Sequence, residues 1–452
     1  MGSAGRACAS YTILSTLLFG VSLIGSAASP AATLEEAVHQ SLSTSPDTLI
    51  DVQERLARDQ ALRQARGGYL PDVDLRAGYG REGSDNVITR AAGNADNVWL
   101  TRQEAELNLR QMLFDGFATR SEVERQTARV SSSAYRVHAG YENTALRTTE
   151  VYLEVLKRRE LLELARRNLA THEAVHAQVV QRTESGLGRR ADLEQADARL
   201  ALARANVETE DGNLTDAQTS YLRVVGVLPD EDMKRPTPAQ GLLPASIDQA
   251  TDQALANHPT LKSAEADVEA AMAQHEAAKH AFYPRFDIEA GRFWGDNLDG
   301  LEGYDNDARA MLVMRYNLYN GGADQARSRE TAYLVNEAKE VRARSHRQVV
   351  ESIRLSWNAL QANERRLKPL RQHVQASQAT REAYRKQFDI GERTLLDLLD
   401  SENELFEARI TATGADYDSL FARYRILAGI AKLVASLGVE LPTEASPLDR
   451  QY

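Results

Sequence analysis

The sequence predicts a mainly α-helical chain that carries a small amount of membrane β structure. Residues 308–318 alternate between apolar and partly charged side chains, as expected for a strand with two unlike faces. Most of the remaining chain has the composition of long helices, with 26% charged residues and only 6% aromatic residues. The two halves of the chain also repeat each other, so each main element is expected twice.

Residues 1–28 have the pattern of a secretory signal peptide. Arg6 supplies positive charge, an apolar run extends from Tyr11 to Gly25, and Ser26-Ala27-Ala28 offers small residues for cleavage. The sole cysteine, Cys8, precedes the apolar run, so we expect the exported chain to have no disulfide and no cysteine for acylation. The formal net charge of -11 and the lack of a dense basic cluster argue against nucleic-acid binding.

An internal duplication organises the rest of the chain. One constant offset relates Leu34, Pro46, Tyr69, Pro71 and Gly78 to Ile247, Pro259, Phe282, Pro284 and Gly291. A second constant offset relates Leu113-Phe114-Asp115-Gly116, Gly186 and Asp192 to Leu318-Tyr319-Asn320-Gly321, Gly391 and Asp397. We therefore assign 29–232 to a first repeat, 233–245 to a linker, 246–438 to a second repeat and 439–452 to a C-terminal tail.

Each repeat is expected to run helix, strand, loop, strand, long helix, turn, helix. In the first repeat we expect a helix from Leu34 with a break before Pro46, then a strand at 73–79, a polar loop at 81–97 and a return strand near Ala105. A long helix should follow from 116 to about 183, with a soft point at Gly140. The repeat should end with a helix at 189–225. In the second repeat we expect a helix at 260–279, a strand through Phe286, Ile288 and Ala290, a loop at 296–307 and the strand at 308–318. A long helix should follow at 323–390, where Pro369 could introduce a kink, and then a helix at 394–437. A helix of roughly 65 residues is about 100 Å long. Two of the shorter helices laid end to end span about the same length. The expected shape is a slender rod, two helices thick.

Four strands are too few to close a barrel. In hydrocarbon an open sheet edge leaves backbone groups without partners. If these strands lie in a membrane, the hairpins of several copies must therefore combine, giving eight strands in a dimer or twelve in a trimer. The residues themselves do not choose between the two. A competing class is a soluble periplasmic coiled-coil scaffold whose strands form a small sandwich.

Two helix-turn motifs carry a resemblance to a known family. They are Ser185-Gly186-Leu187 leading to Asp192, and Ile390-Gly391-Glu392-Arg393-Thr394 leading to Asp397 and Asp400. Together with the duplication and the hairpins, they make the chain resemble the TolC-type family of outer-membrane channels from about Leu34 to Gly438. The resemblance implies a homotrimer in the outer membrane of a Gram-negative bacterium. Its twelve-stranded β-barrel, with four strands per chain, is continued by a long periplasmic α-helical barrel.

The resemblance also implies the site residues and the partners. It implies carboxylate rings that narrow the pore at Asp397 and Asp400, and a latch at Asp192 and Arg393 that holds the tip shut. At Phe388 this sequence departs from a tyrosine in the family, so one hydrogen bond of the latch is expected to be missing. The positions expected to dock a periplasmic adaptor are Gly186, Leu187, Gly391 and Glu392. The remaining implied partners are an inner-membrane ABC exporter or proton-driven pump, outer-membrane lipid and the exported cargo.

The function that we expect is a passive exit duct for polypeptide (type I secretion) or for small molecules. The lack of an acylated cysteine favours polypeptide. We expect no catalytic residue, no metal and no cofactor, since there is no phosphate-binding loop, nucleophile elbow or catalytic cysteine. The segment His172–His176 fits the zinc-protease pattern HExxH, but the matching segment of the other repeat, 377–381, lacks it and no third ligand is evident. We interpret it as a solvated helix face.

Overall fold

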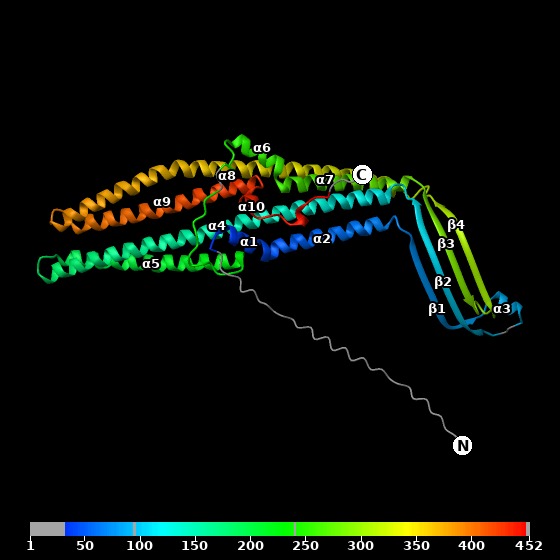
Figure 1. Cartoon of the computed structure of the whole chain (residues 1–452). Coiled ribbons are helices and arrows are strands. Elements are labelled where there is room, and N and C mark those ends of the chain that lie inside the picture. Colours follow the sequence, from blue (N-terminus) through cyan, green and yellow to red (C-terminus); the bar gives the residue numbers. More distant parts are fainter. Residues whose placement is uncertain (1–31, 94–95, 239–240, 449–452) are drawn as a thin grey trace, which may run out of the picture.

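The computed structural model describes residues 32–93, 96–238 and 241–448. The predicted signal peptide lies outside these residues, as does the end of the predicted C-terminal tail. Figure 1 shows a long helical body with a four-stranded sheet at one end and two helix turns at the other. None of the helices in the described ranges is both long and apolar enough to cross a membrane.

The same order of main elements occurs in both halves of the chain. The first half contains α1 (Leu34–Thr44), α2 (Pro46–Gly67), β1 (Asp72–Ser84), the short α3 (Val87–Ala91), β2 (Val98–Phe114), α4 (Ala118–Glu184) and α5 (Arg190–Val225). The second half contains α6 (Ile247–Asn257), α7 (Pro259–Ala278), the 3-10 turn η1 (Lys279–Phe282), β3 (Arg285–Asp296), β4 (Tyr304–Arg315), α8 (Ala323–Asp389) and α9 (Leu395–Gly429), followed by α10 (Leu433–Ser436) and η2 (Thr443–Ala445). Both α4 and α8 have 67 residues, which corresponds to about 100 Å.

Several predicted strand boundaries need correction. β1 has 13 residues and β2 has 17, so the region predicted as a loop at 81–97 contains the end of β1 and all of α3. The strand predicted at 308–318 runs instead from Tyr304 to Arg315. The prediction missed the outer ends of these strands because the residues there are polar and the alternation in the sequence weakens.

The helices also differ from the prediction at the end of α9 and at Gly140. α9 ends at Gly429, since Ala431 has a left-handed backbone with φ of 55° that interrupts the helix. α8 contains Pro369, so the helix predicted at 323–390 is continuous, as expected. α4 continues through Gly140, where a Cβ atom would overlap the carboxylate of Asp51 on α2. Gly140 therefore permits close packing of two helices and is not a soft point.

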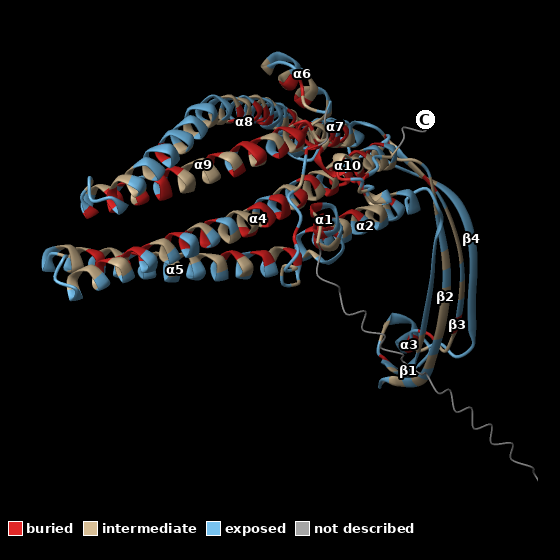
Figure 2. Ribbon diagram, turned by 60° about the vertical axis from the view of Figure 1, so that its left-hand side comes forward, coloured by how far each residue is buried: buried red, intermediate tan, exposed pale blue. Residues whose placement is uncertain are grey.

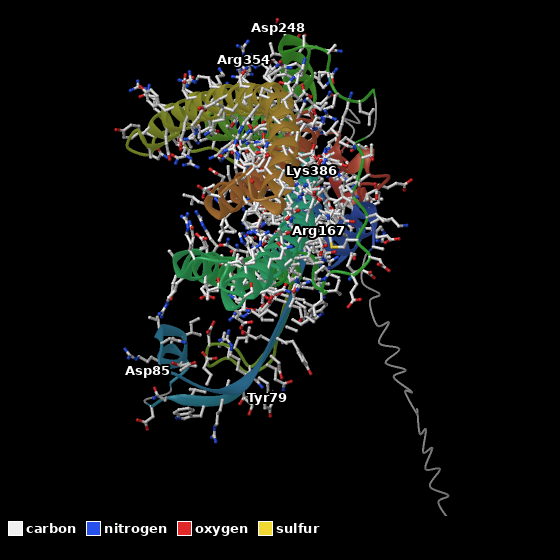
Figure 3. The ribbon with its side chains drawn as sticks, turned by 90° about the vertical axis from the view of Figure 1, so that its left-hand side faces the viewer. Tyr79, Asp85, Arg167, Asp248, Arg354 and Lys386 are labelled. Carbon is white, nitrogen blue, oxygen red and sulfur yellow. The ribbon has the colours of Figure 1, made fainter. Side chains whose placement is uncertain are left out.

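The predicted packing of short helices along long ones is confirmed. α2 and α5 both lie along α4, and α7 and α9 lie along α8 (Figure 1). Figure 2 shows that buried residues follow the inner sides of these helices. The main core lies at mid-body, where Tyr152, Tyr221 and Tyr424 are almost fully buried. There α6 packs on α8, with Asp248 and Arg354 3.7 Å apart and side by side in Figure 3.

The sheet has the strand order β1-β2-β3-β4 and is antiparallel throughout. The hairpins β1–β2 and β3–β4 each come from one half of the chain, and the β2–β3 pairing joins the halves. Among the described residues, β1 and β4 each have one edge that is not paired with a strand.

The register gives the sheet one apolar and one charged face, which confirms the predicted alternation. On the apolar face Leu75 pairs with Leu107 and Ala290 pairs with Ala310. Leu75 and Leu312 on this face are 74% and 66% exposed, so the described residues leave the face uncovered. The opposite face is held together by ion pairs between strands, which include Arg102–Glu82, Arg76–Glu104, Arg309–Glu106 and Arg110–Glu289.

Candidate functional site

The two helix turns form the end of the body that is farthest from the sheet. Gly186 and Gly391 end α4 and α8 with left-handed φ values of 75° and 82°, as expected after a helix C-terminus. The N–H groups of Leu187 and Glu392 then return to helix carbonyl oxygens at 2.9 and 2.8 Å. Leu187 is 86% exposed. The four positions expected to dock an adaptor therefore lie on two similar, protruding turns.

Beneath the turns an apolar cluster joins the two helical hairpins of the chain. Its buried members are Val175, Val179, Ala196, Phe388, Leu395, Leu398 and Leu399. They come from α4, α5, α8 and α9, so both hairpins contribute. Full burial of one leucine side chain stabilises a structure by about 1.5–3 kcal/mol. The cluster therefore favours the arrangement in which the hairpins lie together.

Phe388 belongs to this cluster and is only 5% exposed. The guanidinium of Arg182 on α4 lies 4.7 Å from the centroid of its ring. A cation above an aromatic face is attracted by the electrons of the ring. Phe388, where we expected a missing hydrogen bond, thus makes a different contact between the two hairpins. The sequence alone did not reveal this contact.

Arg393 makes its contacts within its own hairpin. Its Nε donates to Oε1 of Gln387 at 2.9 Å, and its guanidinium lies 4.2 Å from the ring centroid of Tyr384. Its ion pair is with Asp397, at 3.6 Å. Among the described residues, the expected ion pair between Arg393 and Asp192 is not formed. Tyr384 and Gln387 of α8 and Asp397 of α9 hold the guanidinium instead.

Asp397 is fixed by the start of α9. The hydroxyl of Thr394 donates to Oδ2 of Asp397 at 2.8 Å, and the Asp397 N–H donates to the Thr394 hydroxyl at 3.2 Å. This is a capping box. The Thr394 hydrogen bonds and the nearby Arg393 hold the pKa of Asp397 below its ordinary value, so this carboxylate remains charged in neutral and mildly acidic solution.

Asp400 is held from the other hairpin. Nη2 of Arg199 on α5 donates to Oδ1 of Asp400 on α9 at 2.7 Å. The Asp400 side chain stays 55% exposed. This charge-assisted hydrogen bond links the two hairpins at the level of the expected constriction. Sequence reasoning missed Arg199, since only the fold brings it close to Asp400.

The HExxH segment lies on the side of α4 that faces α5. His172 is 5% exposed, and burial lowers its pKa. Nε2 of His176 lies 2.7 Å from Oδ1 of Asp197 on α5. The interpretation as a solvated face is therefore wrong for His172. Within the described ranges, no cluster of three or more potential metal ligands occurs.

Comparison with known proteins gives one family. The model of the family described as "Outer membrane efflux protein" matches residues 37–227 and 250–429. The outer membrane efflux protein BepC of Brucella suis is 27% identical, covering 96% of this chain and 93% of BepC. The outer membrane protein TolC of Vibrio cholerae is 25% identical over 89% and 91%. The alkaline protease secretion protein AprF of Pseudomonas aeruginosa is 27% identical over 88% and 84%.

Solved structures show the same fold. The outer membrane protein VceC of Vibrio cholerae superposes with a TM-score of 0.75 at 18% identity, covering 92% of this chain and 100% of VceC. The two helical hairpins and the four-stranded sheet are thus an arrangement shared with a solved outer membrane protein.

Proposed function

Because the chain belongs to the outer membrane efflux protein family, we propose that it forms a trimeric exit channel in the outer membrane. The family consists of channel proteins and not of enzymes, and it places this chain in the outer membrane. In the proposal, an inner-membrane ABC exporter or proton-driven pump and a periplasmic adaptor pass cargo to the helical body, which conducts it passively to the sheet and out of the cell.

The observation that carries the proposal is the sheet. One face is apolar and exposed, the other is lined with ion pairs, and both edge strands lack a strand partner on one side within the described part of the chain. Lipid can cover an apolar face but cannot pair the backbone groups of a free edge. Edge strands from neighbouring copies can do so. A closed ring of such sheets has lipid outside and a charged, hydrated wall inside.

The helical body supports the same assembly. On α8, Tyr333, Val341 and Leu355 lie on one side by helical spacing and are 73%, 37% and 55% exposed. On α2, Leu49 and Leu56 are 45% and 39% exposed. α2 and α8 lie at opposite ends of the row of contacts α2–α4–α7–α8, so they can meet between copies. Three copies give twelve strands, enough for an open lumen, whereas eight strands leave an interior that side chains fill.

In the proposal the two helix turns form the periplasmic gate. Asp397 and Asp400 of three copies place six carboxylates around the entrance, which attracts cations and repels anions. The apolar cluster and the Arg199–Asp400 pair hold the hairpins together in the closed state. An adaptor that binds the exposed turns more tightly in the open state shifts the population toward opening.

Two classes of cargo are proposed from the relatives. AprF is described as a protease secretion protein, which favours an unfolded polypeptide. BepC is described as an efflux protein, which favours small molecules. Deleting the gene and measuring secreted polypeptides and drug susceptibility separates the two.

Single-channel recording in planar bilayers tests the gate. We expect Asp397→Ala combined with Asp400→Ala to lower the cation-over-anion permeability ratio on the order of severalfold, because the ring of charge is lost. Glu382→Ala, on the exposed side of α8, is the matched control and leaves the ratio unchanged. Since Asp400→Ala also frees Arg199, the double variant is compared with the same variant carrying Arg199→Ala. If the cation-over-anion permeability ratio were unaltered in both variants, the two aspartates would not line the pore.

A further inference from the structure

The outer end of the sheet carries a cap on its charged face. The connection from β3 to β4 folds back so that Leu298 is 9% exposed, and a Cβ atom on Gly295 would overlap its side chain. Gly295 pairs with Glu104, which places it on the charged face. The connection therefore covers this face instead of continuing the direction of the strands.

Internal hydrogen bonds fix this connection. The N–H of Asn297 donates to the carbonyl of Gly303 at 2.9 Å, and the N–H of Gly303 donates to the Asn297 side chain at 3.1 Å. Asn297 and Asp299 have left-handed φ values of 58° and 55°, which residues other than glycine rarely adopt. The connection is therefore held in one defined conformation.

The connection between β1 and β2 docks on it through α3. Nδ2 of Asn86 donates to the carbonyl of Asp299 at 2.7 Å, while Oδ1 of Asn86 caps α3. Thr89 of α3 is 2% exposed and lies against Gly300, where a Cβ atom would overlap it. The connections from the two halves of the chain thus form a single cap.

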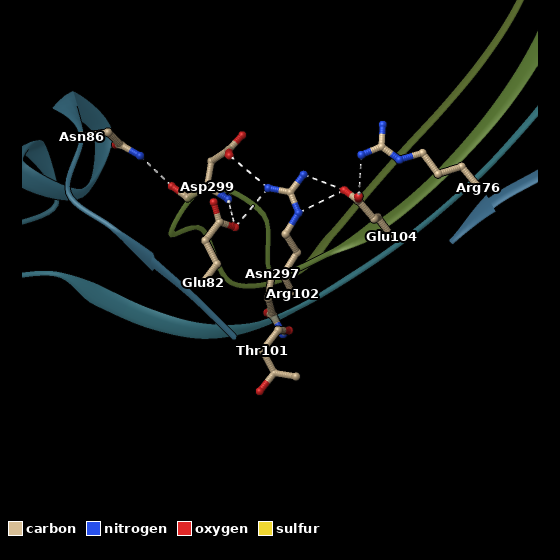
Figure 4. Close-up of polar contacts among 8 residues, drawn as sticks. All are labelled: Arg76, Glu82, Asn86, Thr101, Arg102, Glu104, Asn297 and Asp299. Atoms are coloured by element: carbon tan, nitrogen blue, oxygen red, sulfur yellow. Dashed lines mark hydrogen bonds and ion pairs between the residues drawn. The ribbon is translucent and has the colours of Figure 1, made fainter. Parts of the chain in front are cut away.

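Arg102 ties the cap to the sheet, as Figure 4 shows. Its Nη2 lies 2.6 Å from Oε2 of Glu104, and its Nη1 lies 3.1 Å from Oε2 of Glu82 and 3.4 Å from Oδ1 of Asp299. The N–H of Asp299 donates to the same Glu82 oxygen at 3.4 Å. One guanidinium therefore connects β1, β2 and the β3–β4 connection. Three carboxylates therefore share its single positive charge.

We infer that this cap is a second constriction of the channel, at its outer mouth, and that Arg102 is the residue that positions it. The inference rests on the proposed function, in which the charged face lines the lumen. Figure 2 shows α3 on the concave side of the bent sheet, which faces inward in a closed ring. Val87 and Ile88 of α3 are 82% and 53% exposed, so each copy adds exposed apolar surface to the cap. Apolar narrowing of a pore opposes the passage of water and ions.

Labelling of a cysteine in the lumen tests the inference independently of the periplasmic gate. Met311 pairs with Glu289 on the charged face and is 54% exposed, whereas Leu312 lies on the apolar face. Met311→Cys, in a chain with Cys8→Ser, is treated in intact cells with maleimides of increasing polyethylene glycol length. We expect Arg102→Ala to speed labelling by the large reagent on the order of tenfold and labelling by the smallest reagent much less.

Two further variants control the result. Arg110→Ala removes an arginine from the same strand and the same face without touching the cap, and it should leave the rate for the large reagent low. Asn86→Ala separates the two connections while every sheet residue stays in place, and it should raise that rate even if Arg102→Ala assembles poorly.

The outcomes separate the inference from the function on which it rests. Equal rates for Arg102→Ala, Asn86→Ala and Arg110→Ala with the large reagent would disprove the outer constriction and leave the channel intact. If Leu312→Cys reacted from water as fast as Met311→Cys, the charged face would not line a lumen. In that case the channel proposal would be wrong as well.

Discussion

Glu142 on α4 shows how one buried carboxylate can shape the chain around it. It is 4% exposed, and its oxygens accept hydrogen bonds from the N–H groups of Leu433 and Val434 at 3.1 and 3.4 Å. These bonds hold α10 against α4. Burial raises the pKa of Glu142 to about 8, even though both N–H groups favour the charged form. The imidazole of His138 lies 3.9 Å away, and burial lowers its pKa, which favours the neutral form.

This carboxylate should make stability depend on pH. Because its pKa is higher in the folded chain than in the unfolded one, the folded state binds the extra proton, and the stabilisation is lost as the pH rises through about 8. Glu142→Gln keeps an acceptor oxygen without the charge. We expect it to raise the thermal unfolding midpoint at pH 8 relative to the parent chain, with little change at pH 5. Glu150→Gln, on an exposed side of α4, is the control. An equal shift at both pH values would contradict this account.

At the same scale, the sequence reveals local contacts but not distant ones. Thr394 and Asp397 are three residues apart and form the capping box that such spacing permits. Arg199 lies 201 residues before Asp400, and nothing in the sequence singles it out from the other arginines of α5. The alternation along the strands predicts which face each residue occupies, but not the ion-pair partners across the sheet, because those depend on the register.

Among the elements, the break predicted before Pro46 was found where expected, whereas the end of α9 at Gly429 was missed. α2 begins at Pro46, and α7 begins at Pro259. The end of α9 is followed by Ile430 and Ala431, which carry no such signal. There the N–H groups of Leu433 and Val434 bond to Glu142 on another helix. This tertiary contact anchors the segment that follows α9.

Two helical glycines allow a matched test of element packing. Gly140 on α4 faces Asp51 of α2, where a Cβ atom would overlap the carboxylate, whereas Gly212 on α5 has open space. Alanine favours a helix over glycine by about 1 kcal/mol, so Gly212→Ala should stabilise the protein. Gly140→Ala should be less stable than Gly212→Ala by about 1–3 kcal/mol, since the Asp51 carboxylate must turn away from the added methyl group. Urea unfolding monitored by circular dichroism measures both. Equal changes in the free energy of unfolding for the two variants would show that the Asp51 side chain can turn aside without cost.

For the whole molecule, the most informative feature is the amount of apolar surface that one chain leaves uncovered. The exposed side of α8 with Tyr333 and Leu355, the exposed side of α2 and the apolar sheet face cannot all be satisfied in a monomer. Sequence analysis predicted the sheet part of this surface from four strands that cannot close. It did not predict the helical part, because the apolar residues of α8 are widely spaced and become one stripe only on a continuous helix.

Assembly should therefore depend on α8 as well as on the strands. We expect Tyr333→Glu combined with Leu355→Glu to reduce the trimer that resists heating in detergent, since two charges per copy would be buried between copies. Helical content should stay unchanged, because both side chains are exposed in the single chain. Leu228→Glu, which alters a residue of similar size that is 60% exposed outside the helices, is the control. Size-exclusion chromatography with light scattering gives the mass. If both the double variant and Leu228→Glu kept the mass of the parent trimer, α8 would face solvent in the assembly. The strands alone would then hold the copies together.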